Sequence, residues 1–376
     1  MKIGVVGLGY WGPNLVRNFV STNDVENVVC CDLQDRRIEQ IRKKVPGVEV
    51  CRSVEDLLCR EDVEAVAIAT PVSTHFALAM KALEAGKHLL VEKPLTLKSS
   101  EAETLLEAST KRGLTLMVDH TFIYTSAVRK IRDFLLKGDI GDILYFDSVR
   151  VNLGLFQRDT NVIWDLAPHD LSIMDYLIRK KPIAVSAMGK SHFNTTEDIA
   201  YITVLYPDNV IAHFHVNWIS PVKIRKILIG GTKLMVVYDD MEPSEKIKLF
   251  DRGVEIKEAD SVYKALVEYR TGDMYAPHVA QTEALSLMAA DFVKAITTGS
   301  RPESDAQSGL NVVRLLESAD QSLKMGGLVM PLSANGDGDH EVAVAELQER
   351  QSAHSAGESR LPRWRITADA PAATQS

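Results

Sequence analysis

Residues 1–20 read MKIGVVGLGYWGPNLVRNFV, and this stretch decides the fold of the first domain. An apolar run over residues 1–6 predicts a strand, and the apolar spacing after the glycines predicts a helix. In the Gly-x-Gly-x-x-Gly turn between them, Gly7 permits a tight turn, Gly9 lets the main chain approach a pyrophosphate, and Gly12 lets the helix pack closely on the strand. Free N–H groups at the start of the helix favour a bound phosphate.

An acidic residue follows at the spacing that a dinucleotide site requires. Asp32 ends a second apolar run and stands 20 residues beyond Gly12, where an acid that binds ribose hydroxyls is expected. The alternative to a dinucleotide site is a glycine turn in an unrelated αβ unit. Because the carboxylate would repel a 2′-phosphate, NAD is favoured over NADP, although Arg36 and Arg37 follow closely.

Six apolar strands alternate with helices over roughly the first 120 residues, which predicts a doubly wound parallel sheet. Such sheets bind ligands at the carboxyl ends of their strands. Three polar segments follow these ends: Thr70-Pro71-Val72-Ser73-Thr74-His75, Glu92-Lys93-Pro94 and Asp119-His120-Thr121-Phe122-Ile123-Tyr124. Pro94 favours an extended Lys93, whose ammonium would project over the expected nicotinamide and stabilise an alkoxide. From the spacing alone, the alternative that Lys93 is only a solvated lysine at the end of a strand stays open.

Composition limits the class of protein. A chain of 376 residues is too long for one typical core, so we expect two domains. The net charge of −8 gives no support to binding nucleic acid or an anionic membrane. Met1 leads straight into a strand and no apolar run reaches ~18 residues, so we expect a cytoplasmic protein. The four cysteines lack the spacing of a zinc site, so no metal is expected.

The pattern changes after about residue 140, where β-branched and aromatic runs are joined by turns. This pattern predicts an α+β domain with an open, mainly antiparallel sheet of about six strands. Helices are expected at residues 127–136, about 165–179, 277–297 and 308–324, of which the last two could pack back on the first domain. Such a sheet has one face to bury, so a homodimer or homotetramer is expected.

The expected domains are therefore a dinucleotide-binding domain at residues 1–122 and a substrate-binding and oligomerisation domain at residues 123–332. The remaining residues, 333–376, are rich in Ser, Gly, Asp, Glu and Ala. Because they cannot bury enough apolar surface to offset the entropy of ordering the chain, we expect a disordered tail.

The most informative stretch of the expected second domain is Trp164-Asp165-Leu166-Ala167-Pro168-His169-Asp170. Because proline is tolerated in the first turn of a helix, we expect a helix to begin near Asp165, with Asp165 and His169 one turn apart on one face. The carboxylate would orient the imidazole, and a first-turn position would favour the neutral base. A pair that only caps the helix is the alternative. Arg158 suits a substrate phosphate or carboxylate, unless it only pairs with Asp159.

Together these motifs resemble one family of enzymes. The turn at residues 7–14, the loop at 69–75, Glu92-Lys93-Pro94 and Asp165-x-x-x-His169 resemble the glucose-fructose oxidoreductase, inositol dehydrogenase and MocA (Gfo/Idh/MocA) family over about residues 1–332. More narrowly, residues 7–14 (GLGYWGPN), His120-Thr121-Phe122 and residues 164–173 are similar to bacterial nucleotide-sugar 3-dehydrogenases. Those enzymes oxidise UDP-N-acetylglucosamine or its glucuronate counterpart at the 3-hydroxyl.

The resemblance implies roles for particular residues. It implies that Lys93 and His169 are catalytic and that Asp165 supports His169. The residues expected to bind the dinucleotide are Gly7, Gly9, Tyr10, Trp11, Gly12, Asp32, Thr70, Pro71, His75 and Glu92. Tyr124 and Arg158 are the candidate substrate residues. The chain departs from the family pattern at Asp119, where glycine is often expected.

The expected function is NAD-dependent oxidation of a secondary hydroxyl, at C3, of a UDP-N-acetylated hexose or hexuronate. His169, alone or with Lys93, would remove the hydroxyl proton while a hydride passes to the nicotinamide. Two alternatives remain open: a dehydrogenase of a free polyol or cyclitol, and a non-catalytic dinucleotide-binding sensor.

Overall fold

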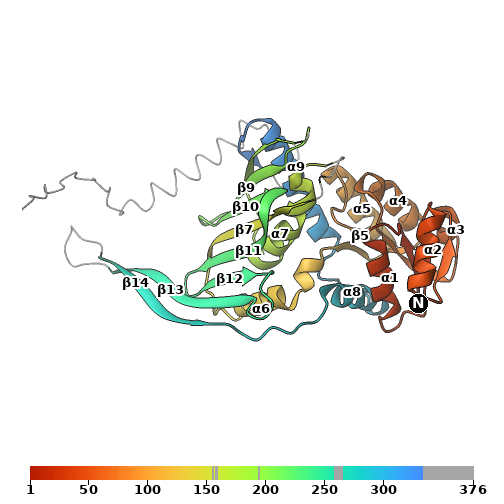
Figure 1. Cartoon of the computed structure of the whole chain (residues 1–376), viewed down its shortest axis with the longest axis horizontal. Helices are drawn as coiled ribbons and strands as arrows, with labels where there is room; N and C mark the ends of the chain where they lie inside the picture. The colour runs from red at the N-terminus through yellow and green to blue at the C-terminus, as the bar shows by residue number, and fades with distance from the viewer. Residues whose placement is uncertain (155, 157–159, 194, 258–265, 333–376) are drawn as a thin grey trace, which may run out of the picture. The chain divides into compact units, whose positions relative to one another are not determined.

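The computed structural model describes residues 1–154, 156, 160–193, 195–257 and 266–332. Arg158 and the expected disordered tail lie outside the described residues. The described residues contain two sheets (Figure 1).

The first sheet has six parallel strands in the order β3-β2-β1-β4-β5-β6. Its strands are β1 (Lys2–Val6), β2 (Asn27–Cys31), β3 (Glu49–Cys51), β4 (Val63–Ile68), β5 (His88–Glu92) and β6 (Leu116–Asp119). The connecting helices are α1 (Gly12–Val20), α2 (Asp35–Lys44), α3 (Val54–Leu58), α4 (His75–Glu84) and α5 (Ser99–Arg112), with short 3₁₀ turns η1 (Val72–Thr74) and η2 (Thr121–Tyr124). The predicted doubly wound parallel sheet is confirmed.

Helices bury both faces of this sheet, which explains why its strands are continuous apolar runs. Helices α1 and α2 cover one face together with α8 (Ala284–Thr298), which contributes Met288 and Phe292 to that core. Helices α3, α4 and α5 cover the other face with α9 (Ala306–Lys324), which contributes Leu310 and Val313. The predicted return of the last two helices to the first sheet is therefore confirmed.

The second sheet is mixed and mainly antiparallel, with the order β14-β13-β12-β11-β7-β10-β9-β8-β15. Its strands are β7 (Ile143–Leu153), β8 (Ala184–Lys190), β9 (Ile199–Leu205), β10 (Ile211–Asn217), β11 (Ile219–Gly231), β12 (Met235–Asp239), β13 (Ile247–Lys257), β14 (Leu266–Tyr275) and β15 (Met330–Pro331). Among the described strands of this second sheet, only β7 and β10 pair in parallel. The expected open sheet is confirmed, but the count of about six strands is too low. The expected strands do not include β14, whose apolar residues are interrupted by the polar run Arg270-Thr271-Gly272-Asp273, or β15, which is only two residues long.

One face of the second sheet is covered by α7 (Val162–Ile178), whose residues join the same core as the inner residues of β7, β9 and β10. Helix α6 (Ser126–Leu136) packs against that core as well. The opposite face carries exposed apolar side chains, among them Met188, Tyr201, Ile211 and Leu228. Tyr201 stacks on the rings of His213 and His215 on that face.

Helix α7 begins earlier than the sequence predicts. It starts at Val162, and the side chain of Asn161 caps it by accepting hydrogen bonds from the main-chain N–H groups of Ile163 and Trp164. The expected start near Asp165 is therefore wrong, and Pro168 lies inside the helix. Asparagine is a strong N-cap, so Asn161 sets the start of α7. Pro168 removes one main-chain hydrogen-bond donor from the helix interior but does not end the helix.

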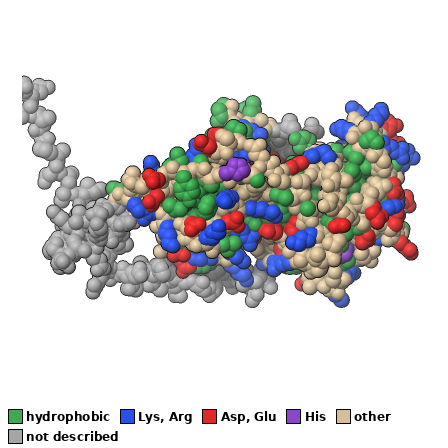
Figure 2. All heavy atoms as spheres, turned by 90° about the horizontal axis from the view of Figure 1, so that it is seen from below, with side chains coloured by type: hydrophobic (Ala, Val, Ile, Leu, Met, Phe, Trp, Pro, Cys, Tyr) green, Lys and Arg blue, Asp and Glu red, His purple; other side chains and the backbone are tan. Residues whose placement is uncertain are grey.

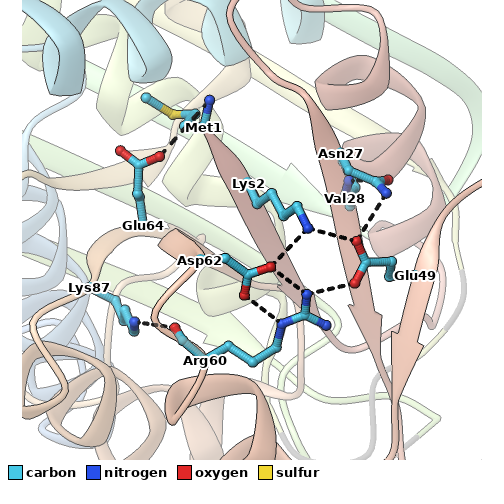
Figure 3. Close-up of polar contacts among 9 residues, drawn as sticks. All are labelled: Met1, Lys2, Asn27, Val28, Glu49, Arg60, Asp62, Glu64 and Lys87. Carbon is cyan, nitrogen blue, oxygen red and sulfur yellow. Dashed lines mark hydrogen bonds and ion pairs between the residues drawn. The ribbon is translucent and has the colours of Figure 1, made fainter.

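At the amino ends of the first sheet, ion pairs join the strands (Figure 3). Lys2 Nζ lies 3.0 Å from Glu49 and 2.8 Å from Asp62, and Arg60 contacts the same two carboxylates. This network lies at the opposite edge from the glycine turn, so we regard it as structural.

The visible surface in Figure 2 mixes Lys and Arg with Asp and Glu side chains, and no broad area of one charge stands out on that face. Within the part of the chain that the structure describes, no helix combines the length and apolar character needed to cross a bilayer.

Candidate functional site

The glycine turn has the geometry that a bound pyrophosphate needs. Gly7 has φ +93°, and a Cβ atom there would lie 2.6 Å from the carbonyl oxygen of Ala69. A Cβ on Gly12 would lie 1.9 Å from the carbonyl oxygen of Gly7. At Gly9 the nearest atom is 4.0 Å away, so the space over its main chain is open. These residues fit a dinucleotide phosphate group at the start of α1.

Asp32 is buried beneath this turn. Its carboxylate accepts hydrogen bonds from the main-chain N–H groups of Leu8 at 2.7 Å and Gln34 at 2.8 Å. Arg37 Nη1 lies 3.3 Å from Asp32 Oδ2, so part of the acidic charge is neutralised within the protein. Tyr10 and Trp11, which precede α1, are exposed beside the turn.

His75 joins the two loops that follow β4 and β5. Its ring nitrogens lie 3.0 Å from the carbonyl oxygen of Pro94 and 2.9 Å from that of Thr70. Thr70 and Pro71 are held in turn by Thr74, whose hydroxyl contacts the Thr70 hydroxyl and donates to the Pro71 carbonyl. Because the imidazole of His75 is buried, it supports the loops and faces them rather than the solvent.

Lys93 extends from the end of β5 to α7. Its Nζ donates to the main-chain carbonyl oxygen of Asp165 at 2.9 Å and lies 3.9 Å from Asp165 Oδ1. Burial lowers the pKa of Lys93, and the nearby acidic groups, Asp165 first, oppose that fall. A lysine in this setting is a well-placed hydrogen-bond donor whose charge depends on its neighbours.

Asp165 does not orient His169 as predicted. Its Oδ2 accepts a hydrogen bond from Trp218 Nε1 at 2.9 Å, and no hydrogen bond between Asp165 and His169 occurs among the described residues. The His169 ring instead meets the edge of Phe122, with ring centroids 5.0 Å apart. Packing therefore orients the imidazole, and the carboxylate of Asp165 is directed toward Lys93 and Trp218.

The pKa of His169 lies well below its usual range, mainly because the imidazole is buried. The positive charges of Lys93, Arg150 and Arg225 lower this pKa further. The sequence predicted that His169 would be neutral because it lies in the first turn, at the positive end of the helix. That cause is wrong, because α7 begins at Val162, about two turns before His169. The result is nevertheless the one that a general base at neutral pH needs, an uncharged imidazole.

Phe122 and two arginines complete the surroundings of His169, and sequence reasoning missed all three roles. Arg150 and Arg225 are opposite one another on β7 and β11, with their guanidinium carbons 4.4 Å and 5.6 Å from the Phe122 ring centroid. Arg150 forms a buried bidentate pair with Asp170, at 2.8 and 2.7 Å. Arg225 has only a 3.4 Å contact to Asp240. The register of the second sheet places the two arginines opposite one another, and the packing of η2 brings Phe122 to them.

The structure does not bring Tyr124 to this group. Tyr124 is fully buried, and its hydroxyl donates to Asp291 at 2.7 Å and contacts Ser304. Glu92 is likewise buried, beside Asp119 on the next strand. No cluster of three or more His, Cys, Asp or Glu side chains suited to a metal ion occurs in the described ranges.

A cavity of about 410 Å³ lies beside η2. Its lining includes Thr125, Tyr238, Asp240, Lys246 and Gln281. Asp240 in this lining also contacts Arg225, whereas Lys93 and His169 are not among the lining residues.

Two family models match the chain. Residues 1–120 match the oxidoreductase family, NAD-binding Rossmann fold model of GFO/IDH/MocA, and residues 128–237 match the GFO/IDH/MocA C-terminal domain. The first sheet is therefore an NAD(P)-binding Rossmann fold.

Individual relatives differ in the substrates that their names give. The solved structure of UDP-N-acetylglucosamine 3-dehydrogenase from Acidithiobacillus ferrooxidans matches with a TM-score of 0.72 and 25% identity, covering 86% of this chain and 98% of that one. A relative of that name and organism is 31% identical over 219 residues, 57% of this chain and 66% of the relative. A scyllo-inositol 2-dehydrogenase (NADP⁺) from Bacillus subtilis is 22% identical and covers 88% of this chain and 96% of its own length.

Proposed function

Because the chain belongs to the GFO/IDH/MocA oxidoreductase family, we propose that it oxidises a secondary hydroxyl, at C3, of a UDP-N-acetylated hexose or hexuronate with NAD. The observation that carries the proposal is the contact of Lys93 with α7, the helix that also bears an uncharged His169. A strong donor that contacts the helix bearing a neutral base suits the oxidation of an alcohol.

In this proposal His169 and Lys93 have different roles. His169 takes the proton of the substrate hydroxyl, and the ammonium of Lys93 stabilises the oxygen as negative charge develops on it. Asp165 holds Lys93 through its main-chain carbonyl. A bound NAD would supply the hydride acceptor for the hydrogen on the carbon that bears this hydroxyl. Phe122 holds the imidazole of His169 by an edge contact. Because the base is then already oriented toward the substrate, this orientation lowers much of the barrier to the reaction.

NAD is the proposed cofactor because Asp32 is a carboxylate at the position that meets the adenosine ribose. A 2′-phosphate there would be repelled by the carboxylate but attracted by Arg37, which already contacts Asp32. The preference for NAD is therefore a balance between these two side chains.

A nucleotide sugar is proposed ahead of a free cyclitol for two reasons. Asp240 in the lining of the 410 Å³ cavity beside η2 contacts Arg225, and we propose that this cavity receives the part of the substrate beyond the sugar ring. The relative that is 31% identical carries the name UDP-N-acetylglucosamine 3-dehydrogenase. The cyclitol remains the second candidate, because the relative named for scyllo-inositol aligns over 88% of this chain.

The partner proposed for the open sheet face is a second copy of this chain. Met188 and Tyr201 are paired in register and are 62% and 44% exposed, so the face offers an apolar stripe. Light scattering should give at least twice the monomer mass, and Tyr201→Lys with Met188→Lys should reduce it. A monomeric wild-type protein would refute this part.

The proposed function is tested by incubating the protein with NAD and a panel of UDP-N-acetylglucosamine, UDP-N-acetylglucosaminuronate, scyllo-inositol and myo-inositol. Formation of NADH is followed by absorbance. We expect turnover with a UDP-sugar only. Turnover with an inositol alone would favour the second candidate, and none with any alcohol would favour a dinucleotide-binding sensor.

A further inference from the structure

Two carboxyl groups lie side by side at the carboxyl ends of neighbouring strands. Glu92 ends β5 and Asp119 ends β6, and the two residues are paired in the register of the parallel sheet. They are only 8% and 3% exposed, so neither carboxyl group is solvated. Buried carboxylates in adjacent positions repel one another strongly, and one of such a pair normally carries a proton.

The hydrogen bonds around the pair indicate which oxygen lacks a donor. Glu92 Oε2 accepts the main-chain N–H of Lys93 at 3.2 Å, and Asp119 Oδ1 accepts a hydrogen bond from the Thr121 hydroxyl. Glu92 Oε1 is buried and has no hydrogen-bond partner in the described part of the chain. If Glu92 is protonated, it can donate to Asp119, and the unpaired oxygen is satisfied.

We infer that Glu92 and Asp119 form one acid–carboxylate pair that holds a single proton and a single negative charge, and that this charge keeps the Lys93 side chain in its ammonium form. Glu92 and Asp119 are then positioning residues that act through Lys93. The inference rests on the role proposed above for Lys93, but the shared proton can be tested without turnover.

The pKa directions agree with this arrangement. Burial raises the pKa of Glu92 well above its usual range, and the charge of Asp119 raises it further. Burial also raises the pKa of Asp119, while the hydrogen bond from Thr121 opposes the rise. The pKa of Lys93 is lowered by burial, so that negative charge nearby is needed to retain its proton.

The charged and titratable groups that face Lys93 come from several elements: His75, Glu92, Asp119, His120, Arg150, Asp165 and His169. Burial lowers the pKa of His120 to about 3, and that of His169 lies well below its usual range, so both rings are neutral near pH 7. Asp165 and the Glu92–Asp119 pair are therefore the negative groups that oppose the charge of Arg150 on Lys93.

The first test is infrared spectroscopy of the full-length protein at pH 7. A protonated carboxylic acid has a carbonyl stretch that a carboxylate lacks. We expect this band in the wild type and its loss in Glu92→Gln, whose amide keeps the shape and can still donate to Asp119. Identical spectra in the carboxylic acid region would mean that both carboxyl groups are ionised and would overturn the inference.

The second test is the pH profile of kcat/KM with the sugar that gives NADH. Asp119→Asn combined with Glu92→Gln leaves no carboxyl group of the pair that can ionise, so Lys93 should lose its proton at lower pH and the alkaline limb should move down by about one pH unit. Glu92→Gln should leave that limb in place. Asp175→Asn is the matched control, because Asp175 is a partly buried carboxyl group on α7 that contacts Asn311 and is not among the main influences on the pKa of Lys93.

An unmoved alkaline limb in the double variant Glu92→Gln with Asp119→Asn would overturn the link to Lys93, whatever the change in rate or Tm. If no sugar is oxidised, the proposed function fails while the infrared result still decides whether the proton is shared.

Discussion

The Nζ atom of Lys93 donates a hydrogen bond to the main-chain carbonyl oxygen of Asp165 at 2.9 Å. This contact joins the end of a Rossmann strand to the helix that covers the second sheet. One turn farther along the helix lies His169, held by its edge contact with Phe122. The two parts of the chain therefore contribute their chemical groups to one place.

Replacing Lys93 with Met removes the ammonium but keeps most of the side-chain volume. We expect kcat to fall by about 100-fold or more, because the developing alkoxide loses its charged donor. Binding of NADH, measured by fluorescence titration, should be unchanged, since Lys93 is not needed for the phosphate turn. A variant with wild-type turnover would exclude Lys93 from the reaction.

Replacing Arg225 with Gln should move the acid limb of kcat/KM to higher pH. Arg225 lowers the pKa of His169, so removing its positive charge makes the imidazole easier to protonate. The shift should be a few tenths of a pH unit, because the Arg225 side chain is 33% exposed and its charge is screened. Lys226→Gln is the control, since Lys226 is the next residue on β11 and pairs with Asp239 on the other face. Equal shifts in both variants would contradict a local effect.

Replacing Asp32 with Ser should reduce the preference for NAD over NADP by about tenfold, which corresponds to about 1.4 kcal/mol. The lost carboxylate no longer repels a 2′-phosphate, and Arg37 is released from its 3.3 Å contact to bind it. The ratio of kcat/KM for the two cofactors measures the effect. Adding Arg37→Gln should abolish the gain for NADP, and an unchanged ratio in Asp32→Ser would mean that another residue reads the ribose.

Alanine at two glycines of one turn should have different consequences. A Cβ at Gly12 would clash with the carbonyl oxygen of Gly7, so Gly12→Ala should destabilise the protein by about 3 kcal/mol. Gly9→Ala has open space and should keep the wild-type Tm while weakening NADH binding, because the methyl group occupies the path of the pyrophosphate. Thermal unfolding and fluorescence titration separate the two effects. Unimpaired NADH binding in Gly9→Ala would place the phosphates elsewhere.

The first sheet could be predicted from the sequence because each of its strands is a short apolar run and each ends where a helix signal begins. The six expected strands are β1 to β6, and the polar segments at residues 70–75, 92–94 and 119–124 lie at the carboxyl ends of β4, β5 and β6. The start of α7 could not be predicted in this way, because Pro168 suggested a first turn while Asn161 supplies the actual cap.

The candidate site was only partly predictable. Lys93 follows a strand and precedes a proline, which is a local signal, and the contact of Lys93 with α7 is compatible with the role expected of it. Phe122, Arg150 and Arg225 meet only through the packing of η2 on β7 and β11, and no local spacing encodes that register. The pairing of Glu92 with Asp119 required the order of the strands as well as their ends.

The central claim, that Lys93 and His169 act on one substrate hydroxyl, is tested most directly by a crystal structure of the protein with NADH and the UDP-sugar that it oxidises. We expect Lys93 Nζ and an imidazole nitrogen of His169 both within about 3.2 Å of the same hydroxyl oxygen, with the carbon that bears it against the nicotinamide. A complex in which the two side chains point into separate cavities, or in which the sugar lies away from both, would contradict the account.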